Sequence, residues 1–426
     1  MKKKLLHIAA HLGTGVGKAI SGLTEGLNEF YENEVLILEP AIQDRFVKVC
    51  ESNGVKVTLA LDVEDIKRHI DSADYVIFNW WGHPLSLKVF QAMKETEARV
   101  FLWSHSNGWF YPYISPEFVD VFDGGLFTSA CSFQNENWKP EQRERIASNS
   151  EEVYGIGAFR ASKITSKENY DRGDEIILGY TGTVNYNKMS REFPRICSEI
   201  KSRVPNAVFK LFGAYDDETR DSFWNYDENL KDCVRFEGFV TDIDKQLLAL
   251  DIYCYPLGKE NFATTDNTMV EAMSSGLPIV VFNNPSERSA ITHNVDGLIA
   301  DTTEEFIEHI VDLCNNPKRA EELGRSARQT AVNRYESTLN VARCVAYLEK
   351  YGQCEKSTHD FLVVVGETAG ENYLYFANMS KEEYIEKVKK GELLTILRGE
   401  TKGSLKHYLN YYSDDILQEL KNVQEV

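Results

Sequence analysis

The chain has 426 residues, of which 42% are hydrophobic and 27% are charged, close to the average for soluble globular proteins. Its 47 basic and 66 acidic residues give a net charge of −19. Nucleic acid is therefore not an expected partner, and overall electrostatics disfavour docking on an anionic membrane. No apolar run is long enough for a transmembrane helix, and the length suggests two or three domains.

The N-terminus predicts a strand rather than a targeting signal. Three lysines precede the apolar stretch LLHIAA, which is too short for a signal peptide and continues into a glycine-containing loop. The eight cysteines are scattered and form no CxxC pair, as expected for reduced and mostly buried thiols. We expect a cytoplasmic protein. The aromatic residues between Trp109 and Tyr113 leave open a peripheral contact with the inner face of the membrane.

The first part of the chain alternates short apolar runs with amphipathic stretches. This alternation predicts βαβ units and a doubly wound parallel sheet with both faces covered by helices. We assign residues 1–160 to this first Rossmann-like domain. The expected strands are residues 5–10, 34–39, 55–60, 75–80, 99–104 and 124–130.

A polar stretch at residues 160–174 lacks apolar periodicity and predicts a linker, after which the alternation restarts. We assign residues 161–334 to a second Rossmann-like domain and residues 335–352 to a helix that returns toward the first. The remaining residues, 353–426, contain two expected strands, DFLVVVGE and NYLYFAN, and two expected helices. They predict a small α+β appendage of unknown role.

Ligands of open α/β sheets bind beyond the carboxyl ends of the strands, so the residues that follow each strand are the first candidates. After the first strand, Gly13 and Gly15 would let the backbone approach a ligand next to a helix N-terminus. Neither the Walker nor the Rossmann glycine pattern fits this loop. A simple strand-to-helix turn explains such glycines equally well.

Aromatic and polar residues follow the fourth and fifth expected strands. Trp81 and His83 follow the fourth, and His105 and Trp109 follow the fifth. Polar groups beside aromatic rings suit the recognition of sugars, whereas tryptophans are also common in cores. His105, flanked by two serines, is the stronger catalytic candidate, because a lone histidine such as His83 is more often structural.

Two residues of the second half could contact a nucleotide. Lys188 lies just before an expected helix and could reach a phosphate, or it could be an ordinary surface lysine. Glu271 lies in the first turn of the expected helix TMVEAMSSG, where its carboxylate could accept both hydroxyls of a ribose. Thr268 and Glu271 also have the spacing of a capping box, so Glu271 could instead cap its own helix.

The segment around Glu271 resembles a known family. Glu260-Asn261-Phe262-Ala263, followed by Glu271-Ala272-Met273-Ser274-Ser275-Gly276-Leu277-Pro278, is similar to the motif of retaining glycosyltransferases with the GT-B fold, specifically the family 4 group. The resemblance covers residues 175–350 well and residues 1–150 more loosely, and it does not reach the last 70 or so residues. It implies two Rossmann-like domains facing a cleft.

The resemblance also implies roles for individual residues. Glu271 would bind the ribose of a nucleoside diphosphate sugar, and Lys188 would bind its phosphates. Asp266, Asn267 and Thr268, in the turn before the helix, would meet the diphosphate. On the side of the first domain, Gly13 and Gly15 would approach the phosphates and His105 would lie near the transferred sugar, while the acceptor-binding candidates are Trp81, His83 and Trp109.

Two departures from the family pattern stand out. The family places seven residues between its two glutamates, but ten separate Glu260 from Glu271, and the eighth position before Glu271 is Ala263. Either the loop has a three-residue insertion with Glu260 in the catalytic role, or the first glutamate is absent. Thr183 stands where the family has a phosphate-binding arginine, so it is included among the donor-binding candidates.

The leading hypothesis is a retaining hexosyltransferase that moves a sugar from a nucleoside diphosphate sugar, with a UDP-sugar as first guess, to a hydroxyl of a glycan, glycolipid or protein-linked acceptor. No cofactor is expected, and no metal. Polysaccharide biosynthesis is what the family suggests. The alternatives are a non-catalytic GT-B module that binds a glycan or a partner transferase, and a sugar-nucleotide epimerase of the same fold. The appendage could also mediate oligomerisation.

Overall fold

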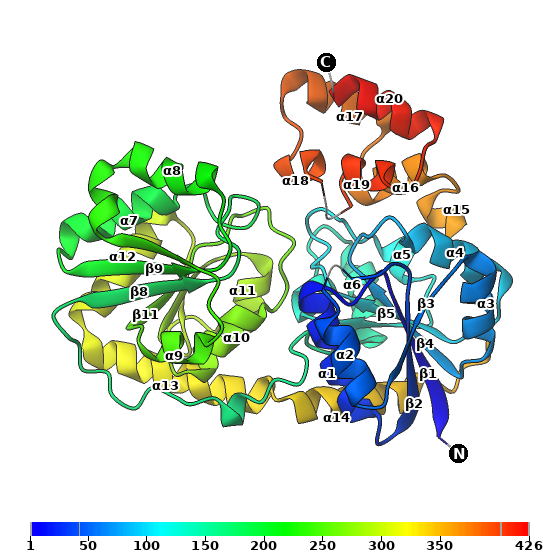
Figure 1. Ribbon diagram of the computed structural model, residues 1–426, viewed down its shortest axis with the longest axis horizontal. Helices are drawn as coiled ribbons and strands as arrows, with labels where there is room; N and C mark the ends of the chain where they lie inside the picture. The colour runs from blue at the N-terminus through cyan, green and yellow to red at the C-terminus, as the bar shows by residue number, and fades with distance from the viewer. Residues whose placement is uncertain (1, 42, 401–402, 425–426) are drawn as a thin grey trace. The chain divides into compact units, whose positions relative to one another are not determined.

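The computed structural model describes residues 2–41, 43–400 and 403–424, which form two compact units (Figure 1). Unit 1 comprises Met1–Ala158, Phe262–Thr264 and Ser337–Val426, and unit 2 comprises Phe159–Asn261 and Thr265–Glu336. Each unit is built around one parallel sheet. In the part of the chain that is described, no helix is both long and apolar enough to cross a membrane.

Unit 1 contains a seven-stranded sheet in the order β3-β2-β1-β4-β5-β6-β7. Side chains of β1 alternate between the two faces: Leu6 and Ile8 join one core, and Leu5 and Ala9 join the other. Because both faces are covered, its strands are runs of apolar residues rather than alternating ones. The strands are β1 (Lys3–Ala9), β2 (Tyr31–Ile37), β3 (Lys56–Leu59), β4 (Tyr75–Trp80), β5 (Val100–Ser104), β6 (Gly124–Phe127) and β7 (Ser150–Glu152).

Helices cover both faces of this sheet. One face packs against α1 (Thr14–Leu27), α2 (Arg45–Ser52) and α14 (Ser337–Tyr351). The other face packs against α3 (Val63–Asp71), α4 (Ser86–Glu95), α5 (Pro116–Val119) and α6 (Pro140–Ser148), together with the C-terminal helices.

The C-terminal segment, residues 353–426, is helical where strands were expected. Its described residues contain α15 (Leu362–Val365), α16 (Ala369–Ala377), α17 (Lys381–Lys390), α18 (Thr395–Arg398), α19 (Leu405–Leu409) and α20 (Asp415–Gln424), and no β-strand. The prediction of two strands was wrong because a short apolar run does not distinguish a strand from a buried helix. The missed signal is the capping box in which Thr368 and Glu371 bond each other's backbone N–H groups and start α16.

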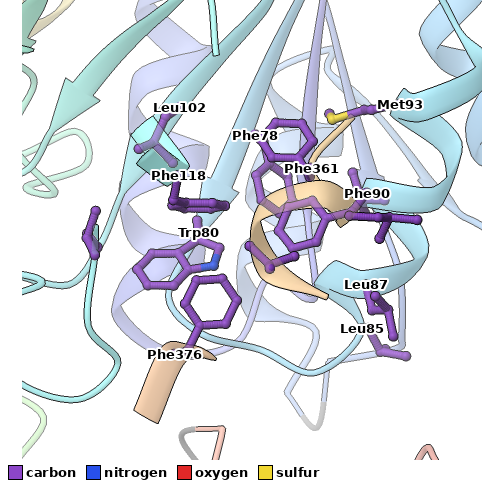
Figure 2. Close-up of a cluster of buried hydrophobic side chains, with 14 of the residues drawn as sticks. Phe78, Trp80, Leu85, Leu87, Phe90, Met93, Leu102, Phe118, Phe361 and Phe376 are labelled. Carbon is purple, nitrogen blue, oxygen red and sulfur yellow. The ribbon is translucent and has the colours of Figure 1, made fainter. Parts of the chain in front are cut away.

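This segment shares a core with the sheet of unit 1 (Figure 2). The ring of Phe376 lies 5.1 Å from Trp80 and 5.3 Å from Phe118, measured between centroids. Phe361 stacks on Phe90 at 4.8 Å. Four residues further along the segment also pack in this core, namely Leu405, Tyr408, Leu417 and Leu420.

Unit 2 contains a six-stranded parallel sheet in the order β10-β9-β8-β11-β12-β13. Its strands are β8 (Ile176–Thr181), β9 (Ala207–Phe212), β10 (Val234–Gly238), β11 (Ile252–Tyr255), β12 (Ile279–Phe282) and β13 (Leu298–Ala300). Its helices are α7 (Phe193–Arg203), α8 (Asp217–Tyr226), α9 (Ile243–Leu248), α10 (Asn267–Ser274), α11 (Pro285–Ala290), α12 (Thr303–Asn315) and α13 (Pro317–Arg334).

Each sheet has one point at which the strand order reverses, between β1 and β4 in unit 1 and between β8 and β11 in unit 2. At such a switch point the connections on either side run in opposite directions, and a crevice opens beyond the carboxyl ends of the two strands. Gly13 and Gly15 follow β1, and Trp81 and His83 follow β4. Lys188 and the loop before α10 follow β8 and β11. The topology therefore places most candidate residues at the two switch points.

Candidate functional site

At the switch point of unit 2, Lys188 is paired with Asp266. The Nζ of Lys188 lies 2.7 Å from Oδ2 of Asp266, and both side chains are about one-fifth exposed, at 21% and 23%. The hydroxyl of Tyr255 donates to the same carboxylate, and the Lys188 ammonium lies 5.6 Å from the centre of that ring. Asp266 is the N-cap residue of α10 but makes no side-chain capping bond. Its carboxylate therefore binds the Lys188 ammonium and does not cap the backbone N–H groups of α10.

The N-terminus of α10 carries a polar atom that is not satisfied within the described structure. There, the buried Oδ1 of Asn267 has no hydrogen-bond partner, whereas the Thr268 hydroxyl interacts with Tyr253. The helix begins at Asn267, with Asp266 as its cap, so Thr268 lies inside the first turn. Thr268 and Glu271 therefore form no capping box, and that explanation for Glu271 is removed. Glu271 is partly buried on α10.

The structure leaves two of the predicted donor-side residues exposed. Glu260 lies in the loop between β11 and α10, with an exposed side chain. Thr183 is also exposed and follows Gly182, whose φ of +134° belongs to a turn that favours glycine. The backbone carbonyl of Thr183 accepts a hydrogen bond from the Tyr180 hydroxyl.

The structure reveals a fully buried carboxyl group, that of Glu287, which the sequence analysis did not identify as a candidate. It follows β12 in α11, and burial raises its pKa, with a smaller contribution from the nearby charge of Asp266. The side chains of Ser286 and Asn284 donate hydrogen bonds to it, which partly offset the effect of burial. The signal was the sequence Asn-Pro-Ser-Glu directly after a buried strand.

In unit 1, His105 is a neutral imidazole of fixed tautomer. Burial, with a smaller contribution from His7, lowers its pKa to about 3. The amide nitrogen of Asn79 donates to the carbonyl of Ile8, so its Oδ1 faces His105 Nε2 at 3.1 Å. Nε2 must therefore carry the proton, and Nδ1 keeps a lone pair. At neutral pH this group accepts a hydrogen bond at Nδ1 and is not a cationic acid.

The loop after β1 combines a close turn with open space. The N–H of Gly13 donates to His11 Nδ1 at 2.9 Å, and α1 begins at the next residue. A Cβ at Gly17 would lie 2.0 Å from the Leu12 carbonyl oxygen, so packing requires that glycine. A Cβ at Gly15 would meet no atom within 4 Å. Packing therefore does not explain Gly15, and the space beside it is open to a ligand.

His11, Glu39 and His83 meet at the carboxyl ends of β1, β2 and β4, with one ligating atom of each within 4.8 Å of the others. His83 Nε2 lies 3.2 Å from a Glu39 oxygen, and the N–H of Leu85 donates to His83 Nδ1. His11 also accepts a backbone N–H at Nδ1. Both rings therefore carry their proton on Nε2, facing the carboxylate, whereas a metal ligand needs that nitrogen bare and Nδ1 donating. The donor set suits a hydrogen-bonded carboxylate better than a metal ion.

The two tryptophan candidates differ in exposure. Trp81 is partly exposed, and its ring lies 5.5 Å from His11 and 6.4 Å from His105. Trp109 is only 8% exposed, and its indole N–H donates to the carbonyl of Cys131 at 2.6 Å. Tyr111 is likewise buried. Trp109 and Tyr111 are therefore both buried in unit 1.

Comparisons with known proteins bear on both units. Residues 162–330 match the family model described as "Glycosyl transferases group 1". The protein named "Putative glycosyltransferase EpsD" from Bacillus subtilis (strain 168) is 21% identical over 210 residues, which cover 48% of this chain and 54% of that protein. The chain thus spans about half the length of this relative.

Two solved structures resemble most of the chain in fold. A glycosyltransferase from Rickettsia africae ESF-5 has a TM-score of 0.65 at 14% identity, covering 83% of this chain and 100% of that one. HepE from Anabaena, in complex with UDP, has a TM-score of 0.64 at 14% identity, covering 82% and 100%. A crystal structure of HepE with UDP-glucose matches with a TM-score of 0.63.

At such low identity these structures show the fold, and the family model identifies the domain that carries Lys188 and Glu271. The predicted Rossmann-like architecture is confirmed by the two parallel sheets. The chain has the GT-B fold, and its residues 162–330 match the model of the glycosyl transferases group 1 family.

Proposed function

We propose that the chain is a retaining glycosyltransferase that moves a sugar from a UDP-sugar to a hydroxyl of a glycan or glycolipid without a metal ion. One observation carries the proposal. The Lys188–Asp266 pair lies at the N-terminus of α10, at the switch point of the domain that matches the group 1 family model. A cation beside a helix N-terminus is suited to binding a diphosphate.

The chemistry follows from the charge that develops during transfer. When the bond between sugar and diphosphate breaks, negative charge accumulates on the leaving diphosphate. The Lys188 ammonium and the α10 N-terminus would stabilise that charge from fixed positions. The Asp266 carboxylate would itself repel phosphate, so its role is to hold Lys188 in place until the donor arrives. This revises the expectation that the Asp266 side chain meets the diphosphate.

His105 would act as a hydrogen-bonding group rather than as an acid. Its Nδ1 lone pair can accept a hydroxyl of the transferred sugar, and its low pKa keeps the ring neutral at physiological pH. In the retaining route we propose, the donor phosphate takes the proton of the acceptor hydroxyl, so no enzymic nucleophile is needed.

We propose UDP as the nucleotide of the donor because the structure of HepE, which shares the fold, was determined with UDP and with UDP-glucose. A role in polysaccharide biosynthesis at the cytoplasmic side of the membrane remains part of the same proposal. Burial of Trp109 and Tyr111 gives no support to a membrane contact through those residues.

The test is release of nucleotide from a panel of UDP-, GDP-, dTDP- and CDP-sugars in the presence of EDTA. We expect slow hydrolysis of a UDP-sugar by the native protein and its loss in Glu271→Gln, with Glu218→Gln, an exposed glutamate of α8, as the matched control. NMR of the first sugar released should show the anomeric configuration of the donor. An inverted product would overturn retention, and dependence on a divalent ion would overturn metal independence. Unchanged release by Glu271→Gln would contradict the assigned ribose contact.

A further inference from the structure

The C-terminal segment contributes two side chains to the end of the unit 1 sheet. The hydroxyl of Tyr411 donates a hydrogen bond to Oε2 of Glu39, at 2.5 Å. The ring of His407 lies 4.6 Å from His83, edge to face. Together with His11 these residues form what we call the Glu39 cluster: His11, Glu39, His83, His407 and Tyr411. All five belong to unit 1.

Two glycines make this approach possible. Gly82 and Gly403 have φ values of +77° and +76°. A Cβ at Gly403 would lie 2.3 Å from the carbonyl oxygen of Gly82, so the two backbones touch. Tyr111 fixes the same point by donating its hydroxyl to the Gly403 carbonyl. Just beyond it, the Ser404 hydroxyl accepts the N–H of His407 and starts α19. The chain is therefore built to hold His407 and Tyr411 at this position.

The Glu39 carboxylate is ionised at neutral pH. Burial opposes ionisation of Glu39, but hydrogen bonds from His83 and Tyr411 outweigh it and lower its pKa to about 2. The Glu39 side chain is still 25% exposed and that of His11 is 23% exposed. A carboxylate has about four lone-pair positions, so the two hydrogen bonds leave it able to accept more from a ligand. A hydroxyl fits this requirement, and a phosphate or carboxylate would be repelled.

The side chain next to the Glu39 cluster is aromatic. Trp81 is partly exposed, 5.5 Å from His11 and 6.0 Å from His83 between ring centroids. The ring of His105 lies 6.4 Å from that of Trp81. An aromatic ring can cover the C–H face of a sugar while a carboxylate accepts its hydroxyls. The patch thus offers both kinds of contact that a saccharide needs, on the same edge of the sheet as His105.

We propose that the Glu39 cluster and Trp81 bind a neutral saccharide unit of the acceptor, and that Tyr411 and His407 make the C-terminal segment part of this specificity site. The proposal rests on the proposed transferase function, and it names residues outside the part of the chain that matches the family model. Glu39 accepts the acceptor hydroxyls, His83 and Tyr411 orient its carboxylate, and Trp81 supports the sugar ring.

Direct binding tests the proposal without depending on sugar transfer. The probes are methyl α- and β-glycosides of glucose, galactose, mannose and N-acetylglucosamine, measured with the full chain by saturation-transfer-difference NMR. We expect one or more of them to bind, and Glu39→Gln and Tyr411→Phe to weaken binding about tenfold, as for loss of a charge-assisted hydrogen bond. The matched control is Tyr412→Phe. The buried hydroxyl of Tyr412 has no hydrogen-bond partner among the described residues, so this change should leave binding as it is.

Three results would overturn the proposal: no binding of any neutral glycoside, equal binding by all variants, or preferential binding of methyl glucuronide or glucose 6-phosphate over the neutral probes. A thermal melt checks that each variant is folded, and the conservative Glu39→Gln change serves if Tyr411→Phe is not. Nucleotide release by the native protein separates the two proposals. Glycoside binding without release would refute the transferase and keep the saccharide site, and release without glycoside binding would do the reverse.

Discussion

The ammonium of Lys188 and the carboxylate of Asp266 form an ion pair 2.7 Å long at the N-terminus of α10. The pair holds the Lys188 ammonium where the proposed diphosphate would bind, and the Tyr255 hydroxyl donates a hydrogen bond to the same carboxylate. Binding of a diphosphate requires Lys188 to exchange part of its interaction with Asp266 for the phosphate oxygens. The two members of the pair should therefore affect nucleotide affinity in opposite directions.

Lys188→Met should weaken UDP binding and lower the rate of nucleotide release by about 10²-fold or more, because a preorganised charge at the leaving group is lost. Asp266→Asn should strengthen UDP binding by about tenfold at low salt, because a nearby negative charge is removed. Isothermal titration calorimetry measures both affinities. The control is Lys245→Met, which removes an exposed lysine of α9. Weaker UDP binding by Asp266→Asn would contradict the assigned role of the carboxylate.

Glu260 and Glu271 should differ in their effect on nucleotide release. Glu271 lies partly buried on α10, whereas Glu260 is exposed in the preceding loop. We expect Glu271→Gln to reduce kcat/KM for the donor by about tenfold or more, as expected for loss of hydrogen bonds to a charged group. Glu260→Gln should have a smaller effect. Steady-state kinetics with varied donor measure both. An equal or larger loss for Glu260→Gln would mean that the loop carries the family's first glutamate in its catalytic role.

His7 should make unit 1 sensitive to acid. It is fully buried in β1, neither ring nitrogen has a hydrogen-bond partner within the described structure, and burial lowers its pKa to about 3. Between pH 6.5 and 3 the unfolded chain binds a proton that the folded protein excludes, so the free energy of unfolding falls as the pH falls. His7→Leu removes this dependence and also removes a buried polar group without a partner.

The measurement is urea unfolding at pH 7.5 and pH 5.0, followed by tryptophan fluorescence. Five of the six tryptophans lie in unit 1, namely Trp80, Trp81, Trp103, Trp109 and Trp138, so the signal reports mainly on that unit. We expect His7→Leu to be more stable than the native protein at pH 7.5, and the difference to grow by about 2 kcal/mol at pH 5.0. A difference independent of pH would show that His7 can be protonated in the folded state.

The C-terminal helices should be required for the stability of unit 1. Phe376 is 2% exposed and packs on Trp80 and Phe118 (Figure 2). Phe376→Ala should lower the free energy of unfolding by about 3–5 kcal/mol, because it removes a buried ring and leaves a cavity. Val363→Ala in the same segment, at a position 81% exposed, should change it by less than about 0.5 kcal/mol. Equal effects would mean that the segment is not docked on this core. The mass of the full chain in solution tests the separate prediction of an oligomer.

Much of the fold was predictable because its information is local. Apolar runs such as Tyr75–Trp80 have to be buried on both faces. The helical stretches between these runs can cover both faces of a parallel sheet, so the alternation predicts that arrangement. The Glu271 to Pro278 segment likewise marked the helix and strand at the unit 2 switch point. The prediction of strands within residues 360–377 was wrong because their apolar pattern fits a helix as well as a strand. A capping box favours the helix there.

The sequence by itself determined the two Rossmann-like domains, the resemblance of the second to a glycosyltransferase family and the position of Lys188 and Glu271 along its strands and helices. Only the tertiary structure decided which charges meet. Nothing in the chain order pairs Glu39 with Tyr411, 372 residues apart, because that contact depends on two glycines that let separate backbones touch. In the same way, the neutral state of His105 and the burial of Trp109 follow from the packing that surrounds them. A side chain's charge and exposure are properties of its surroundings, and folding brings those surroundings from distant parts of the sequence.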